Sequence, residues 1–144
     1  MTAEQTRLLL LAQHDRLRDH LRTCTRLAQL YATGDIEVAI DLDLSLEVLR
    51  AEFAAHNESE SAAVRQLLQG PAQWSALMID RMLEEHVAEH AAFWDLLSGT
   101  RSEVVGKIDD LVEELDAHMA AEERTFLAPV TLREDVIQTR TKTR

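Results

Sequence analysis

The chain has 144 residues, enough for one domain with a single substantial core, and its 46% hydrophobic content is ordinary for a soluble globular protein. Only four glycines and two prolines occur, which favours an all-α fold. The formal net charge of −11 argues against a nucleic-acid partner, because phosphate contact normally needs a basic face.

Turn signals divide the chain into four long segments. We predict helices over four ranges: 3–32, 36–69, 72–98 and 101–128. The first break is at Gly34, which supplies a helix stop, and Asp35 follows it as an N-cap. The second break pairs Gly70 with Pro71, a residue suited to the first turn of the next helix. The third break lies around Gly99.

Two capping boxes support these boundaries. Thr2 and Gln5 have capping-box spacing at the start of the first helix, and Thr100 and Glu103 have it at the start of the last one. In such a box the two side chains satisfy backbone N–H groups that the helix leaves without partners, so both helix starts are well specified.

The end of the chain differs in composition from the rest. Pro129 is expected to end the last helix, and residues 131–144 are polar, threonine-rich and without a clear apolar period. We therefore predict one domain over residues 1–130 followed by a loose tail. The tail is locally basic, so it could dock a protein partner.

The single cysteine and the lack of long apolar runs bear on the compartment. Cys24 excludes an internal disulfide framework and fits a reducing compartment, so we expect a cytoplasmic protein. The apolar run from Leu8 to Ala12 is too short for a signal peptide. No apolar run is long enough to span a membrane, so no membrane partner is expected.

Each predicted helix carries an inward stripe at alternating spacings of four and three residues, which is typical of helices packed in a bundle. The stripes are apolar except at seven positions: His14, His56, Glu60, His86, His90, His118 and Glu122. Burying this many titratable groups costs free energy unless something pairs them, and a metal centre does so directly. Imidazole and carboxylate together form a ligand set suited to iron.

The spacing of these groups places them at similar levels along the predicted bundle. The last six form three pairs spaced i,i+4, so each pair lies on one helix face about one turn apart. Residues on adjacent antiparallel helices share a level when the turn lies midway between them, and the midpoint of His14 and His56 is Asp35. The midpoint between the His56/Glu60 pair and the His86/His90 pair lies close to the second break. The midpoint between the His86/His90 pair and the His118/Glu122 pair falls at Val104, about five residues past Gly99.

This pattern resembles the hemerythrin-like, or HHE cation-binding, family. That family has one histidine on helix 1, HxxxE on helix 2, HxxxH on helix 3 and HxxxE or HxxxxD on helix 4. The matching positions are His14, His56 with Glu60, His86 with His90, and His118 with Glu122 or Glu123. The resemblance spans residues 10 to 130 and is most specific in the HMAAEERTFLAP segment. The helix 2 segment, HNESESAAVRQLL, lacks the aromatic-proline ending often found there.

The resemblance implies an antiparallel up-and-down four-helix bundle with two non-haem iron ions bridged by an oxo or hydroxo group. It divides the histidines into His86, His90 and His118 for one iron, and His14 and His56 for the other. Glu60 and a helix 4 glutamate would bridge the ions. The inward stripe favours Glu122 for that role, whereas the HxxxxD variant of the family would use Glu123.

The donor mix favours one kind of chemistry. Five histidines and two carboxylates carry less negative charge than a carboxylate-rich oxidase centre, so high-valent iron is harder to reach. We therefore expect an O2-binding protein that acts as carrier, store or sensor. An enzyme acting on peroxide, nitric oxide or ferrous iron is one alternative, and an interaction module with a structural metal is another. Manganese or zinc would fit similar ligands.

Other polar residues have structural interpretations. Alone, His14 would be interpreted as a hydrogen-bonded core histidine, but six further groups accompany it. His20 lies off the stripe and is expected to be solvated, while Cys24 lies on it and is expected to be an inert buried thiol. Four glutamates are expected to form a solvated face that could supply an outer partner for a ligand imidazole: Glu58, Glu84, Glu85 and Glu89.

Overall fold

The computed structural model describes residues 1–69 and 75–128. They form α1 (Ala3–Ala32), the short 3-10 helix η1 (Ile36–Val38), α2 (Ala39–Gln69), α3 (Ala76–Leu97) and α4 (Arg101–Arg124). No strand occurs within the described ranges, so the expected all-helical fold is confirmed for them. None of their helices combines the length and apolarity that a membrane crossing requires.

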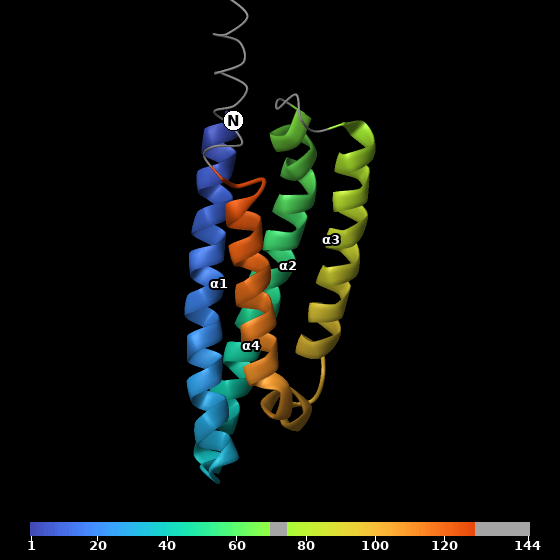
Figure 1. Ribbon diagram of the computed structural model, residues 1–144. Coiled ribbons are helices and arrows are strands. Elements are labelled where there is room, and N and C mark those ends of the chain that lie inside the picture. Colours follow the sequence, from blue (N-terminus) through green and yellow to red (C-terminus); the bar gives the residue numbers. More distant parts are fainter. Residues whose placement is uncertain (70–74, 129–144) are drawn as a thin grey trace, which may run out of the picture.

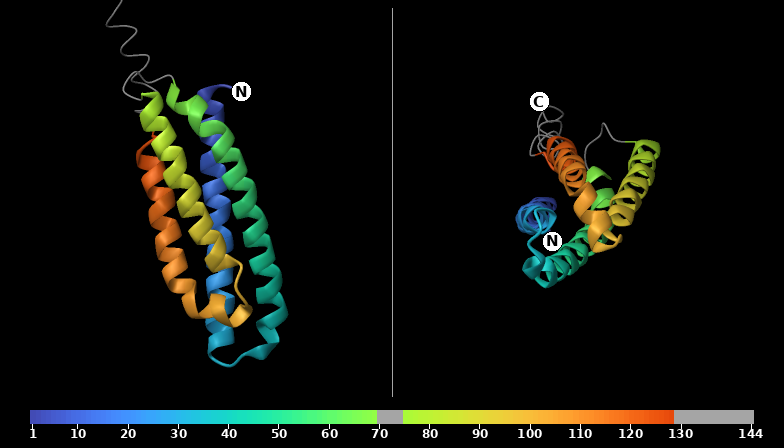
Figure 2. Two further views of the ribbon diagram at one scale, coloured as in Figure 1. Left: turned by 90° about the vertical axis from the view of Figure 1, so that its right-hand side faces the viewer. Right: turned by 90° about the horizontal axis from the view of Figure 1, so that it is seen from below.

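The four α-helices lie side by side along one long axis (Figure 1). In that view α1 runs away from the labelled N terminus, α2 returns toward that end, and α3 and α4 repeat the two directions. α1 contacts α2 and α4, and α3 also contacts both of these helices. The end-on view in Figure 2 shows the helices arranged around a shared interior, which is compatible with a four-helix bundle.

The helix starts and stops follow local chemistry. At α1 the Thr2 side chain accepts the Gln5 backbone N–H at 3.1 Å, and the Gln5 side chain accepts the Thr2 N–H at 2.8 Å. Thr100 and Glu103 form the same reciprocal box at α4, so both predicted capping boxes are confirmed. After α1, Gly34 takes a φ of 101°, the left-handed region that glycine adopts without a steric penalty.

Two helices begin later than predicted. The Asp35 side chain accepts the Glu37 N–H at 3.2 Å, which starts the helical segment as a 3-10 turn, and α2 follows it. α3 begins at residue 76 and not at residue 72, because Ser75 caps it by accepting the Met78 N–H at 3.2 Å.

The last helix ends earlier than the predicted residue 128. The backbone N–H groups of Thr125 and Leu127 both donate to the Glu122 carbonyl, at 3.2 and 3.0 Å, so a turn replaces the expected final helical residues. The predicted second break and the predicted tail lie outside the described residues.

The apolar core consists of two clusters separated by a polar layer. On α1, His14 lies between Leu10 of the smaller cluster and Leu17 of the larger one. His118 and Glu122 of α4 lie between Leu115 of the larger cluster and Phe126, which follows the helix and belongs to the smaller cluster. α2 and α3 follow the same succession, so every helix contributes its polar stripe residues to one layer.

Packing in the larger cluster should dominate the stability of the fold. Leu49 is 0% exposed there, so Leu49→Ala should lower the free energy of unfolding by about 2–5 kcal/mol, through lost burial and the cavity it leaves. Leu44, on the same helix, is 55% exposed, and Leu44→Ala should change that free energy by less than about 0.5 kcal/mol. Urea unfolding measures both, and equal losses would contradict this packing.

Candidate metal centre

The polar layer brings together all seven side chains that the sequence singles out. They come from all four α-helices: His14 from α1, His56 and Glu60 from α2, His86 and His90 from α3, and His118 and Glu122 from α4. The i,i+4 spacing explains why each pair faces the same way, since residues one helical turn apart share a face. The meeting of the four helices at one level is a property of the fold.

The donor atoms of these side chains form two overlapping groups. In each group all atoms lie within 4.8 Å of one another, which is close enough to hold a metal ion. One group contains Glu60, His86, His90, His118 and Glu122, and the other contains His14, His56, Glu60 and Glu122. The histidines therefore divide in the way that the family resemblance implies, and the same two carboxylates occur in both groups.

Glu60 lies between the two sets of imidazoles. Its Oε2 is 2.8 Å from His56 Nε2 and 4.0 Å from His14 Nε2. Its Oε1 is 2.8 Å from His86 Nε2 and 3.5 Å from His90 Nε2. Each oxygen thus faces a different histidine set, which is the arrangement that a carboxylate needs in order to span two cations.

Glu122 spans the sets from the opposite helix. Its Oε2 is 2.7 Å from His86 Nε2, and its Oε1 is 3.2 Å from His14 Nε2. The same Oε1 is 3.4 Å from His118 Nε2. Glu123, the other glutamate considered for this position, belongs to neither group and contacts the outer face of His14.

Many inner donor atoms lack a hydrogen-bond partner although they are buried. Among the described residues these are His14 Nε2, His56 Nε2, His90 Nε2, His118 Nε2, both Glu60 oxygens and Glu122 Oε1. An unsatisfied buried polar atom costs about 1–3 kcal/mol, so a layer of them is expensive without a further partner. Imidazole nitrogens and carboxylate oxygens that face one another match the ligands of a transition-metal ion, so this donor set fits a metal.

The outer nitrogens of three histidines are held by side chains around the layer. His56 Nδ1 lies 2.9 Å from Gln13 Oε1, and Gln13 Nε2 donates to Ser59 Oγ at 3.2 Å. His118 Nδ1 bonds to the Glu89 carboxylate. Because carbonyl and carboxylate oxygens only accept, the imidazoles must donate from Nδ1, and their neutral forms keep a lone pair on the inner Nε2.

His14 has a charged outer partner. Its Nδ1 lies 2.7 Å from Glu123 Oε2, and Arg18 Nη2 donates to both Glu123 oxygens at 2.8 and 2.9 Å. Such outer contacts orient a metal-binding imidazole and increase its basicity. The sequence anticipated a partner of this kind among the exposed glutamates, and Glu89 proves to be one.

Sequence reasoning missed two of these outer contacts. Arg18 lies one helical turn after His14, so its i,i+4 spacing could have indicated a charged group on that side of the helix. Gln13 gave no comparable signal, because it lies next to His14 and off the stripe. His20 is half-buried, lies 4.0 Å from Glu52 and belongs to neither donor group.

The electrostatics of the layer oppose the effect of burial. Burial alone would raise the pKa of Glu60, but the imidazoles of His56 and His86 hold the pKa below its ordinary value. Burial would likewise lower the pKa of His86, yet Glu122 and Glu60 raise it to about 10. The pKa of His14 is also raised, against its burial, by Glu122 and Glu123. Without a cation, protons therefore occupy the layer.

Comparison of the chain with protein-family models, with curated proteins and with solved structures finds no match. The interpretation of the centre therefore rests on the chemistry and geometry of its side chains.

Metal binding should stabilise the fold in a way that depends on the seven side chains. A ligand that binds only the folded state at a hundred times its dissociation constant adds about 2.7 kcal/mol to the free energy of unfolding. Thermal unfolding, measured without oxygen in the presence and absence of ferrous ion, should show this gain. His56→Ala and His118→Ala should each lose metal, whereas His20→Ala should not. If both cluster variants kept the full metal content, the ligand assignment would be wrong.

Metal and protons should compete for the layer. Since the pKa of His86 is about 10 without metal, its ring carries a proton at neutral pH, and binding must release it. Lower pH supplies more competing protons, so affinity should fall as the pH drops from about 8 to about 6. Calorimetry in two buffers of different ionisation enthalpy measures the protons released. Binding without proton release would contradict this electrostatic description.

Proposed function

We propose that this chain is a hemerythrin-like protein, an antiparallel up-and-down four-helix bundle that holds two non-haem iron ions and binds O2. The observation that supports this most is the pair of overlapping donor groups, which share Glu60 and Glu122 and contain three and two histidines. The alternating chain directions in Figure 1 agree with such a bundle. A carrier, a store and a sensor are all forms of this function.

The two histidine sets would give the ions unequal surroundings. When bound, the two irons would supply reversible electron transfer to and from a small oxidant. His86, His90 and His118 would hold one ion, His14 and His56 the other, and Glu60 and Glu122 would contact both. The second set has one nitrogen fewer, so the position for a small ligand is expected on that side.

The surroundings of the layer favour a small ligand over an organic substrate. Phe53 packs against His90 with ring centroids 5.9 Å apart, and Phe93 packs against His118 at 5.4 Å. These rings fix the imidazoles in place and exclude water on the side of the larger cluster. His14 and His56, the histidines of the second donor group, are 0% and 3% exposed, so little space remains beside them for a large molecule.

A di-iron oxidoreductase acting on peroxide or nitric oxide is the second candidate. The His86 side chain is 14% exposed and lines a cavity of about 230 Å³, so a small polar substrate could approach this side of the layer. The same donors would serve either function, and the response to peroxide distinguishes them.

Elemental analysis combined with absorption spectra tests the proposal. Protein purified in the presence of iron should hold about two iron ions per chain and should change colour reversibly between deoxygenated and aerated buffer. His20→Ala should retain both properties, and Glu122→Gln should lose metal whereas Glu123→Gln should keep it. Steady evolution of oxygen from peroxide would favour the enzyme. Zinc alone, or an iron content that leaves the spectrum unchanged in air, would contradict O2 binding.

A further inference from the structure

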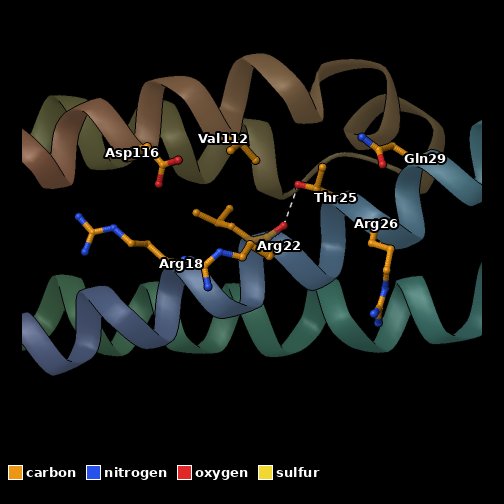
Figure 3. Close-up of a pocket in the computed structure, with 8 residues that line it drawn as sticks. Arg18, Arg22, Thr25, Arg26, Gln29, Val112 and Asp116 are labelled. Atoms are coloured by element: carbon orange, nitrogen blue, oxygen red, sulfur yellow. Dashed lines mark hydrogen bonds between the residues drawn. The ribbon is translucent and has the colours of Figure 1, made fainter.

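Two grooves flank α4, and they differ in charge. The first lies between α1 and α4, encloses about 360 Å³ and is lined by three arginines of α1, Arg18, Arg22 and Arg26 (Figure 3). We call it the arginine groove. The second lies between α3 and α4, where two cavities of about 460 and 230 Å³ share Glu89 and His118. We call it the acidic groove, because Glu85, Glu89 and Glu114 line it.

Of these two, the acidic groove alone reaches the donor layer. Its lining includes three of the seven cluster residues, His86, His118 and Glu122. The lining of the arginine groove includes none of them. Two cluster residues that line the acidic groove, His118 and Glu122, have side chains that are more than nine-tenths buried, and each carries an atom without a hydrogen-bond partner, Nε2 and Oε1. The lining of the groove therefore includes residues with buried, unsatisfied donor atoms.

Exposure falls across the layer from the acidic groove inward. The side chains of His86, His90 and His118 are 14%, 10% and 8% exposed. Those of His14 and His56, on the far side, are 0% and 3% exposed. An ion that enters from solvent therefore meets the set of His86, His90 and His118 first.

The geometry points to the acidic groove as the route by which divalent metal cations reach the layer, an inference that rests on the proposed metal centre. Among the described residues that line its two cavities, none is a lysine or an arginine. Carboxylates along a channel raise the local concentration of cations and their rate of association. The described lining of the arginine groove has three guanidinium groups and one carboxylate, Asp116, so this groove attracts cations less, although Arg18 and Arg22 also pair with Glu123 and Asp19.

Glu89 is placed to transfer the cation from solvent to the layer. Its side chain is 51% exposed, and its carboxylate bonds to His118 Nδ1, so it contacts both solvent and a cluster imidazole. The cavity beside it is lined by two small exposed residues, Ala92 from α3 and Ala117 from α4, and by the buried Phe93. A hydrated ion can therefore approach Glu89 along the exposed alanines.

The test is the rate of metal uptake by the metal-free full chain. Anaerobic stopped-flow mixing with ferrous ion gives the second-order rate constant, and elemental analysis gives the final metal content. The double variant Glu85→Gln with Glu114→Gln should lower the rate constant by about three- to tenfold at low ionic strength, with the final content unchanged. High salt should abolish the difference. Asp116→Asn, a matched change on α4 in the arginine groove, should leave the rate unchanged.

A steric variant tests the route without changing charge. Ala92→Phe places an aromatic ring in the acidic groove at an exposed position, so uptake should slow at any salt concentration while the fold is kept. Equal rates for this variant, the double variant and the unmodified chain would overturn the route alone. A lower final metal content in the double variant would also overturn it, because the glutamates would then act in binding. No uptake by the unmodified chain would overturn the metal centre as well.

Discussion

The structure depends on the burial of two carboxylates among five imidazoles. Glu60 is 0% exposed and Glu122 is 2% exposed. Within the described residues, neither carboxylate forms an ion pair with a lysine or an arginine. Desolvating two anions at this depth costs several kcal/mol each unless cations or protons compensate. The four helices supply that compensation only when they meet at one level, so the fold and the donor layer specify each other.

The apolar clusters on either side of the layer keep the helices in that register. The larger cluster fills the interior on one side and the smaller cluster fills it on the other, so a slip of any one helix along its axis would bury its polar stripe residues in an apolar cluster. Such a slip would leave Glu60 or Glu122 without imidazoles, which is far more costly than a change of apolar contacts. The polar layer therefore fixes the register, and the clusters provide most of the stabilising burial.

Helical periodicity was enough to select the seven side chains that meet in the layer, with Glu122 favoured over Glu123, because each lies on the inward face of its own helix. The levels expected from the sequence matched less well at the third turn, because the midpoint between the polar pairs of α3 and α4 lies past Gly99. The structure accounts for it, since the chain runs on beyond the end of α3 before α4 turns back (Figure 1). Arg50 holds this extension by donating to the Leu97 carbonyl at 2.6 Å. Such a contact joins helices that are distant in sequence, so a periodic pattern gives no sign of it.

The contacts of Gln13 and Arg18 were missed for the same reason, and the outer contacts make the two halves of the layer unequal. On the sealed side, the carboxylate behind His14 is neutralised by Arg18, and the partner of His56 is the uncharged amide of Gln13. On the side that faces the acidic groove, the partner of His118 is Glu89, which has no arginine or lysine partner among the recorded ion pairs of the described residues. A charged acceptor increases the basicity of its imidazole more than an amide does. Among these three imidazoles, that of His118 therefore has the outer partner that increases basicity most, and this difference follows from the helix that supplies each outer side chain.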